Sequence, residues 1–161
     1  MMNTGLYTSD RSDWATPAHF FHALDAIYHF DLDVCASENN HKCSTYFDKE
    51  IDGLQQSWGN HICFMNPPYG REIGAWVCKA HEESRKGATV VALLPCRTDT
   101  NWWKHVMKAD ELYFVHKRLH FDDSANAAPF PSCVVVWKPH RQGRKSAPRC
   151  KLVDHNFSPI N

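Results

Sequence analysis

One short loop carries side chains that could bind an amine. Asn66-Pro67-Pro68-Tyr69 follows the apolar run Ile62-Cys63-Phe64-Met65, which has the composition of a buried strand. The two prolines fix φ and lack an N–H group, so the loop is stiff and its carbonyl groups need not pair within it. The Asn66 amide oxygen and the Pro67 carbonyl can both accept from one exocyclic NH₂ group, and Tyr69 offers a face for a stacked base. The pattern favours a pocket for a planar amine over a turn that merely ends a strand.

This loop and five other segments, in a fixed order, resemble a known protein family. The other segments are Trp14-Ala15-Thr16-Pro17, residues 30–36, Asp52-Gly53-Leu54, residues 94–100 and residues 128–132. From about Asp13 to Trp137 the chain is similar to amino-methyltransferases that use S-adenosylmethionine, and most of all to the small phage and prophage DNA N-6-adenine methyltransferases. The resemblance implies methyl transfer from S-adenosylmethionine to the exocyclic amine of adenine in DNA, with Asn66, Pro67, Pro68 and Tyr69 as catalytic residues.

The chemistry implied by the resemblance suits these residue types. An aromatic amine is a poor nucleophile because its lone pair is delocalised into the ring, and hydrogen bonds to Asn66 and Pro67 would localise that lone pair. A base inside a duplex cannot reach such a pocket, so it would be flipped out and stacked on Tyr69. The same tetrapeptide also serves methylation of guanine amines in RNA or of a protein glutamine, and both substrates stay open as alternatives. So does a non-catalytic zinc-bound or nucleic-acid-binding module.

Cofactor contacts are expected at the carboxyl ends of the strands, where open α/β sheets bind their ligands. Asp33 lies at such an end and could contact the cofactor or cap the local backbone. One departure from the family is plain, since residues 36–40 contain no glycine where amino-methyltransferases carry a glycine-rich loop. Despite this departure, the resemblance implies the following cofactor-binding residues: Trp14, Thr16, Pro17, Asp33, Cys35, Ala36, Asp52 and Asn66.

Contacts to the nucleic acid are expected at the same sheet edge. Arg97, Thr98 and Asp99 follow the continuous aliphatic run of residues 89–94. We expect these three residues, with Tyr69, to bind the flipped base or a phosphate, although Arg97 could equally be an ordinary surface arginine.

The cysteine pattern argues for a reduced, metal-free protein. The seven cysteines are an odd number, and several lie within apolar runs, which favours a cytoplasmic protein of a bacterial or phage-infected cell. A zinc site is the alternative, because Cys35, His41, Cys43, His61 and Cys63 supply enough ligands. Two of these cysteines lie in predicted strands and the one-residue spacings are unusual, so no metal is predicted. No apolar stretch approaches the roughly 20 residues of a membrane span, and no signal peptide is expected.

Hydrophobic periodicity predicts alternating helices and strands, the pattern of an α/β fold. A helix is expected over 17–28, with Thr16 as its N-cap and Phe20, Leu24 and Ile27 on one face. A second is expected over 71–86, with Trp76 on its apolar face and Gly87 at its end, and a short one after Thr100 with Trp103, Val106 and Met107 buried. Strands are expected over 32–36, 62–65, 89–94, 112–115 and 133–137. Asp33 and Asn66 are too close for three parallel crossovers. The expected fold is therefore a compact, partly truncated doubly wound methyltransferase-type (Rossmann-like) sheet with an antiparallel pair at its end.

The charge distribution divides the chain into a body and a tail. Residues 138–161 carry six Lys and Arg against Asp154 alone, so the tail has a net charge of +5 and the remainder −5. We expect residues 1–137 to form a single methyltransferase domain, with residues 1–13 mobile. The tail is expected to be irregular, to bind DNA phosphates or remain solvated, and to be removable without loss of the fold.

Overall fold

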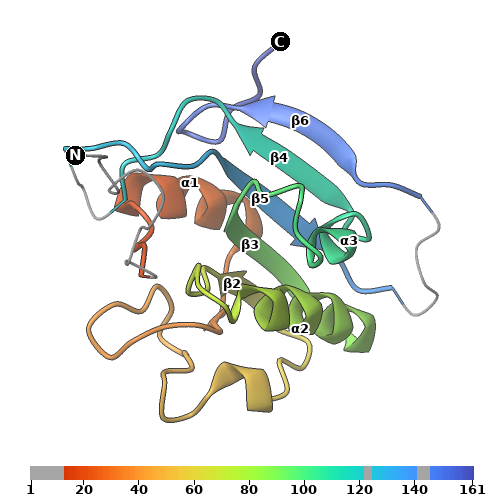
Figure 1. Ribbon diagram of the computed structural model, residues 1–161. Coiled ribbons are helices and arrows are strands. Elements are labelled where there is room, and N and C mark those ends of the chain that lie inside the picture. The colour runs from red at the N-terminus through yellow and green to blue at the C-terminus, as the bar shows by residue number, and fades with distance from the viewer. Residues whose placement is uncertain (1–12, 122–124, 141–145) are drawn as a thin grey trace, which may run out of the picture.

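The computed structural model describes residues 13–121, 125–140 and 146–161 (Figure 1). The expectation that residues 1–13 are mobile falls, apart from Asp13, outside this part of the chain, as do the tail residues Arg141, Arg144 and Lys145. The elements in chain order are α1 (Ala18–Tyr28), β1 (Leu32–Asp33), η2 (Gly53–Gln55), β2 (Ile62–Met65), α2 (Ile73–Lys86), β3 (Thr89–Pro95), α3 (Trp103–Val106), β4 (Glu111–Val115), β5 (Ser132–Trp137) and β6 (Arg149–Val153).

The six strands found in the described residues form one sheet in the order β1-β2-β3-β5-β4-β6. Strands β1, β2 and β3 are parallel, whereas β5 runs antiparallel to both of its neighbours, β3 and β4. The expected α/β fold with parallel strands and an antiparallel pair is confirmed. Since β1 to β3 all run the same way, their carboxyl ends meet at one edge of the sheet, where open α/β sheets bind ligands.

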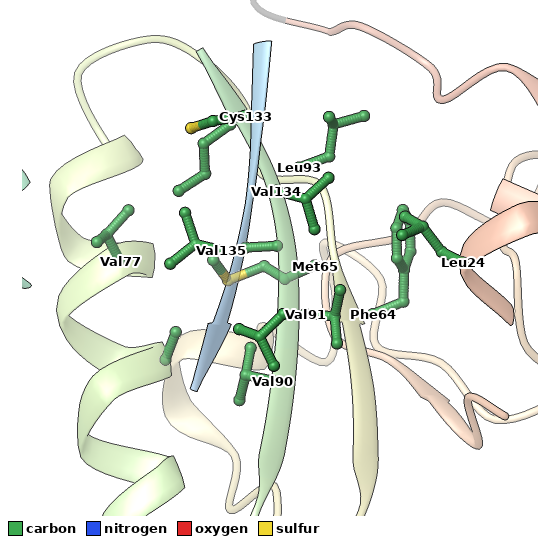
Figure 2. Close-up of a cluster of buried hydrophobic side chains, with 14 of the residues drawn as sticks. Leu24, Phe64, Met65, Val77, Val90, Val91, Leu93, Cys133, Val134 and Val135 are labelled. Atoms are coloured by element: carbon green, nitrogen blue, oxygen red, sulfur yellow. The ribbon is translucent and has the colours of Figure 1, made fainter. Parts of the chain in front are cut away.

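The core lies around the two central strands. Every residue of β5 is buried, as is every residue of β3 after Thr89. Figure 2 shows why: Val77 of α2 and Leu24 of α1 approach these strands from opposite sides. Strands covered on both faces need aliphatic side chains at successive positions, which explains the runs of valine and leucine in β3 and β5.

The helices are close to their predicted positions, but two side chains predicted to be buried are exposed. Helix α1 buries Phe20, Phe21 and Leu24, while Ile27 is 55% exposed, so its prediction as a core residue is wrong. Met107 follows α3 and is 45% exposed, so it too is wrongly predicted as buried. Both errors come from extending a helical period past the turn that contacts the sheet. No helix in the described ranges is long and apolar enough to cross a membrane.

Residues 34–61 connect β1 to β2. All of them are described, and none lies in an α-helix. In Figure 1 this segment, coloured orange to yellow, lies beside α2 at the β1 edge of the sheet and contains the single turn η2. Its anchor is the fully buried Trp58, whose indole donates to the Gly53 carbonyl at 2.9 Å and whose backbone N–H donates to the Glu83 carboxylate at 2.9 Å. The expected truncation of the fold therefore takes the form of a lost crossover helix.

The prediction that the C-terminal tail is irregular is wrong for part of the tail. Residues 149–153 form β6, which pairs with β4 in parallel from Glu111 opposite Arg149 to Val115 opposite Val153. Val153 and Phe157 are buried, and the Phe157 ring lies 4.7 Å from that of Tyr113. The first four residues of β6 are exposed, so this edge strand has no apolar pattern that sequence analysis could detect. Removal of the tail would therefore take away core contacts.

Candidate functional site

A cleft of about 990 Å³ opens at the carboxyl ends of β1 and β2. Its walls come from three parts of the chain, namely residues 13–16, the connection after β1, and the loop and first turns after β2. Nine of the predicted site residues line it: Trp14, Thr16, Asp33, Cys35, Ala36, Asp52, Asn66, Pro67 and Pro68. Five predicted residues do not line this cleft: Pro17, Tyr69, Arg97, Thr98 and Asp99.

The side-chain amide of Asn66 has one fixed orientation. Its Nδ2 donates to the Trp14 carbonyl at 2.5 Å and to the Thr16 hydroxyl at 2.9 Å. The Oδ1 atom is buried and has no hydrogen-bond partner among the described residues. A buried acceptor without a donor costs roughly 1–3 kcal/mol, so such atoms usually have a role. The Oδ1 atom can therefore accept a hydrogen bond from a donor that the described part of the chain does not supply.

Tyr69 is placed differently from the prediction. Its ring is only 5% exposed, its hydroxyl donates to the Leu93 carbonyl at 2.9 Å, and Phe121 and Phe130 contact the ring edge-on. Burial raises the pKa of the Tyr69 hydroxyl well above its usual value, so it stays protonated and able to donate. In this position Tyr69 anchors the proline loop onto β3. The structure does not support the prediction that its ring presents an open face to a base.

Asp33 lines the cleft, but its carboxylate oxygens accept hydrogen bonds from the backbone. It is 2% exposed and accepts from the backbone N–H groups of Cys35 and Lys42, at 3.3 and 2.9 Å. Burial raises the pKa of this carboxyl, although the two backbone hydrogen bonds act in the opposite direction. Burial likewise raises the pKa of the Cys35 thiol to about 12, so that thiol is neutral and unreactive at ordinary pH. Asp33 therefore shapes the turn after β1, which forms part of the cleft wall.

Asp52 and Gly53 fix the far wall. Asp52 has a left-handed backbone (φ 54°), and its carboxylate accepts from the Leu54 N–H at 3.1 Å, capping η2. A Cβ atom at Gly53 would lie 2.2 Å from the Val34 carbonyl oxygen, so only glycine allows this close approach. Gly53 therefore lets the chain after Asp52 pack directly against the Val34 carbonyl at the end of β1.

Several cleft residues were missed by sequence analysis. Tyr46, Phe47 and Glu72 line it, and so does Trp76, which is 6% exposed and whose Nε1 has no hydrogen-bond partner among the described residues. The helical period of α2 correctly predicts that Trp76 is buried, but no pattern in the sequence indicates that its indole N–H would be left without an acceptor. Tyr46 and Phe47 lie in a stretch without periodicity, and Glu72 is a charged residue at the start of the predicted helix, outside its apolar face.

The charge of the cleft is strongly acidic. Asp13, Asp33, Glu38, Asp48, Glu50, Asp52 and Glu72 line it, against Lys42 and Lys49. A cleft with this balance favours a ligand that carries positive charge and disfavours the phosphate backbone of a nucleic acid. Among the described residues, no group of three or more His, Cys, Asp or Glu side chains is arranged to hold a metal ion.

Arg97 lies beside the loop rather than in the cleft. Its guanidinium donates to the Tyr69 carbonyl at 3.4 Å and lies 5.8 Å from the centre of the Phe130 ring. Thr98 and Asp99 belong to the turn that follows β3, where both residues are exposed. Arg97 thus supports the proline loop from outside, and the neighbouring turn faces solvent.

Pro17 starts α1 and contributes no cleft surface. It occupies the N-cap position with an extended backbone (φ −56°, ψ 136°), one residue later than the predicted Thr16 cap. Among the described residues no side-chain hydrogen bond caps this helix, and the Thr16 hydroxyl accepts from Asn66.

Comparison with known proteins gives a consistent result. The chain is 34% identical over 126 residues to the DNA N-6-adenine-methyltransferase of Haemophilus phage HP1 (strain HP1c1), an alignment that covers 75% of this chain and 72% of the phage protein. It is 32% identical over 119 residues to the DNA N-6-adenine-methyltransferase of Escherichia phage T1, covering 72% of this chain and 50% of that protein. A shorter alignment of 63 residues, 30% identical, links it to the putative methyltransferase YfdM of Escherichia coli (strain K12), covering 35% of this chain and 69% of that protein.

The family match extends over almost the whole chain. The sequence profile of the family described as DNA N-6-adenine-methyltransferase (Dam) matches residues 3–156, which include the cleft, the proline loop and β6. The resemblance found in the sequence is therefore confirmed, and this chain belongs to the DNA N-6-adenine-methyltransferase family.

Proposed function

We propose that this protein transfers a methyl group from S-adenosylmethionine to the exocyclic amine of adenine in DNA. The observation that carries the proposal is the Asn66 amide, whose Nδ2 is fixed by two acceptors while the buried Oδ1 lacks a donor among the described residues. The exocyclic NH₂ group of adenine supplies the missing donor. Membership in an adenine-methylating family selects this amine over the guanine and glutamine amines.

The cleft fits the proposed cofactor in volume and in charge. S-adenosylmethionine supplies a methyl group on a positively charged sulfonium, and it also carries an ammonium group. A cleft lined by seven carboxylates and two lysines stabilises such cations, and about 990 Å³ is ample for a nucleoside with an amino-acid arm. Asp52 and Glu72 offer carboxylate oxygens, and the Trp76 indole offers an N–H donor that no described residue accepts.

The catalytic contribution of the protein is positioning and charge stabilisation. In the proposed reaction, the Asn66 Oδ1 and the Pro67 carbonyl accept from the adenine amine, which draws the lone pair out of the ring and stabilises positive charge that develops on nitrogen. The N–CH₃ bond would form as the C–S bond of the sulfonium breaks, which leaves a neutral thioether, and the methylated amine would then lose one proton to solvent. A neutral amide accepts without binding a proton. Tyr69 serves in this proposal by holding the proline loop against the Leu93 carbonyl.

The adenine must leave the duplex to reach Asn66, because a stacked and paired base does not expose its amine to a cleft. We propose that the turn of residues 97–99 contacts the DNA, since this turn faces solvent and Arg97 adjoins the proline loop. The reaction is proposed to occur in the cytoplasm, which suits seven cysteines that are all free thiols.

The direct test is methyl transfer from S-adenosylmethionine with a labelled methyl group. Unmethylated duplex DNA, single-stranded DNA, RNA and a glutamine-containing protein are offered in parallel, and the modified unit is identified by digestion and mass spectrometry. The proposal expects N6-methyladenine from DNA. Label in guanine of RNA or in glutamine would overturn the substrate, and no label in any acceptor would overturn the activity.

The matched control is Asn66→Ala. We expect this variant to lose about 10²-fold or more in turnover, as happens when one polar group that stabilises a transition state is removed. Its dissociation constant for S-adenosylmethionine should stay within a few-fold of wild type, measured by calorimetry. Full activity in Asn66→Ala would remove Asn66 from the catalytic machinery.

A further inference from the structure

The orientation of the Asn66 amide depends on a segment fifty residues earlier in the chain. An amide can be turned by 180° so that its oxygen and nitrogen exchange places, and only the surrounding groups decide between the two arrangements. Here one neighbour is the Trp14 carbonyl, which can accept but cannot donate, at 2.5 Å from Nδ2. The other is the Thr16 hydroxyl, which accepts from the same nitrogen at 2.9 Å. The turned arrangement would place two acceptors, Oδ1 and the Trp14 carbonyl, in contact.

Thr16 is available for this task because its hydroxyl does not cap the helix that follows. A threonine just before a helix ordinarily caps the first turn with its hydroxyl. Helix α1 instead has Pro17 at the N-cap, and no side chain in the described part of the protein caps it. The Thr16 side chain is 4% exposed and lines the cleft, so its hydroxyl is held out of solvent next to Asn66.

The Trp14 carbonyl is held in place by an aromatic cluster that also holds the proline loop. The Trp14 ring contacts Phe121 and Phe130 edge-on, with ring centres 5.6 and 5.2 Å away. The same two phenylalanines contact Tyr69 at 6.2 and 5.4 Å. The acceptor segment and the loop that carries Asn66 are therefore fixed to one common support.

We infer that Thr16, together with the Trp14 main chain, is a positioning residue that holds the Asn66 amide with Oδ1 available to the substrate amine. This inference rests on the proposed function, because it concerns the same amide. If the amide turned over, its NH₂ group would face the NH₂ group of the adenine, and neither could accept. The Trp14 carbonyl thus excludes the inactive arrangement, and the Thr16 hydroxyl adds a second hydrogen bond that holds the active one, without touching the substrate.

The variants Thr16→Val and Thr16→Ser separate the hydroxyl from the shape of the side chain. Valine keeps the branched shape and removes the acceptor, whereas serine keeps the acceptor. We expect Thr16→Val to lower turnover about tenfold, the usual weight of one buried hydrogen bond, with the S-adenosylmethionine dissociation constant within about twofold of wild type. Thr16→Ser should restore turnover to within about twofold of wild type, since one hydroxyl replaces another.

A spectroscopic readout follows the amide itself. The Asn66 side-chain NH₂ resonance, assigned by its absence in Asn66→Ala, should exchange slowly with solvent in wild type because its nitrogen donates twice to buried acceptors. Exchange should quicken in Thr16→Val and stay slow in Thr16→Ser. Should Thr16→Val be poorly folded, the comparison of Thr16→Ser with Thr16→Ala gives the same information.

The outcomes are distinct from those that test the proposed function. If wild type methylates adenine and Thr16→Val does so at the same rate, the inference is wrong. It is equally wrong if Thr16→Val loses activity only through weaker cofactor binding, because Thr16 would then be a cofactor contact. If wild type methylates nothing, the proposed function fails, while the exchange of the Asn66 amide still reports whether Thr16 holds it.

Discussion

Asn66→Asp is the most informative change in this molecule, because aspartate has the shape of asparagine but cannot donate when ionised. In the wild type, Nδ2 donates at 2.5 Å to the Trp14 carbonyl and at 2.9 Å to Thr16. An ionised aspartate at this position would face the Trp14 carbonyl with a second oxygen and would have to rotate away. A simple view, in which any carboxylate accepts as well as an amide, predicts no loss.

The expected loss follows from the two hydrogen bonds. At about 1 kcal/mol each, they represent about 2 kcal/mol of positioning, or about a 30-fold fall in turnover. The turnover of this variant should also depend on pH in a definite direction. Burial and the neighbouring carbonyl favour the neutral carboxylic acid, so the pKa of the introduced carboxyl should lie above its usual range. Protonation gives the side chain a donor again, so the variant should recover as the pH falls.

The assay is methyl transfer to DNA over roughly pH 6 to 9, expressed as the ratio of variant to wild-type turnover so that pH effects common to both proteins cancel. The ratio should be lowest at high pH and rise towards low pH. Asn66→Ala, which cannot donate in any protonation state, is the control and should show a flat ratio. An Asn66→Asp ratio near one at high pH would refute the claim that this position must donate.

Three further changes test other parts of the structure. Asp33→Ala should weaken S-adenosylmethionine binding roughly 10- to 100-fold by calorimetry, because the turn after β1 loses its two backbone hydrogen bonds; an unchanged dissociation constant with a normal melting temperature would leave Asp33 without a role in the cleft. Gly53→Ala should lower the free energy of unfolding by about 2–3 kcal/mol in urea, since its Cβ would meet the Val34 carbonyl at 2.2 Å, and a wild-type midpoint would contradict that close approach. Phe157→Ala should cost about 3–5 kcal/mol through lost packing on Tyr113, whereas the exposed neighbour Asn156→Ala should cost little; equal stability of the two variants would show that the tail is not docked.

Sequence analysis succeeds where a local pattern is sufficient. Strand β2 has the predicted bounds, Ile62–Met65, because a continuous apolar run followed by two prolines leaves few alternatives. Helix α2 ends at Gly87, whose φ of 128° suits glycine as the residue that ends a helix. The cleft residues at the ends of β1 and β2 follow from the same reasoning, because parallel strands present their carboxyl ends at one edge.

The misses come from contacts between distant segments. The link from Thr16 to Asn66 joins residues fifty positions apart, and a threonine before a helix looks like an ordinary cap. The placement of Tyr69 in the core depends on Phe121 and Phe130, which lie in the connection between β4 and β5. Strand β6 shows no apolar alternation because the sheet edge exposes most of it, so only the pairing with β4 defines it as a strand.

The connection between β1 and β2, whose described residues 34–61 contain no α-helix, also has an evolutionary consequence. It forms a wall of the cleft, yet its turns around residues 37–41 and 49–51 are largely exposed and carry little of the core. Doubling the length of a flexible loop costs only about 0.6 kcal/mol in chain entropy, so insertions at these turns are cheap. A segment whose length and side chains can change without disturbing the sheet lets selection reshape the entrance to the cleft, while the fold and the Asn66 loop are inherited unchanged.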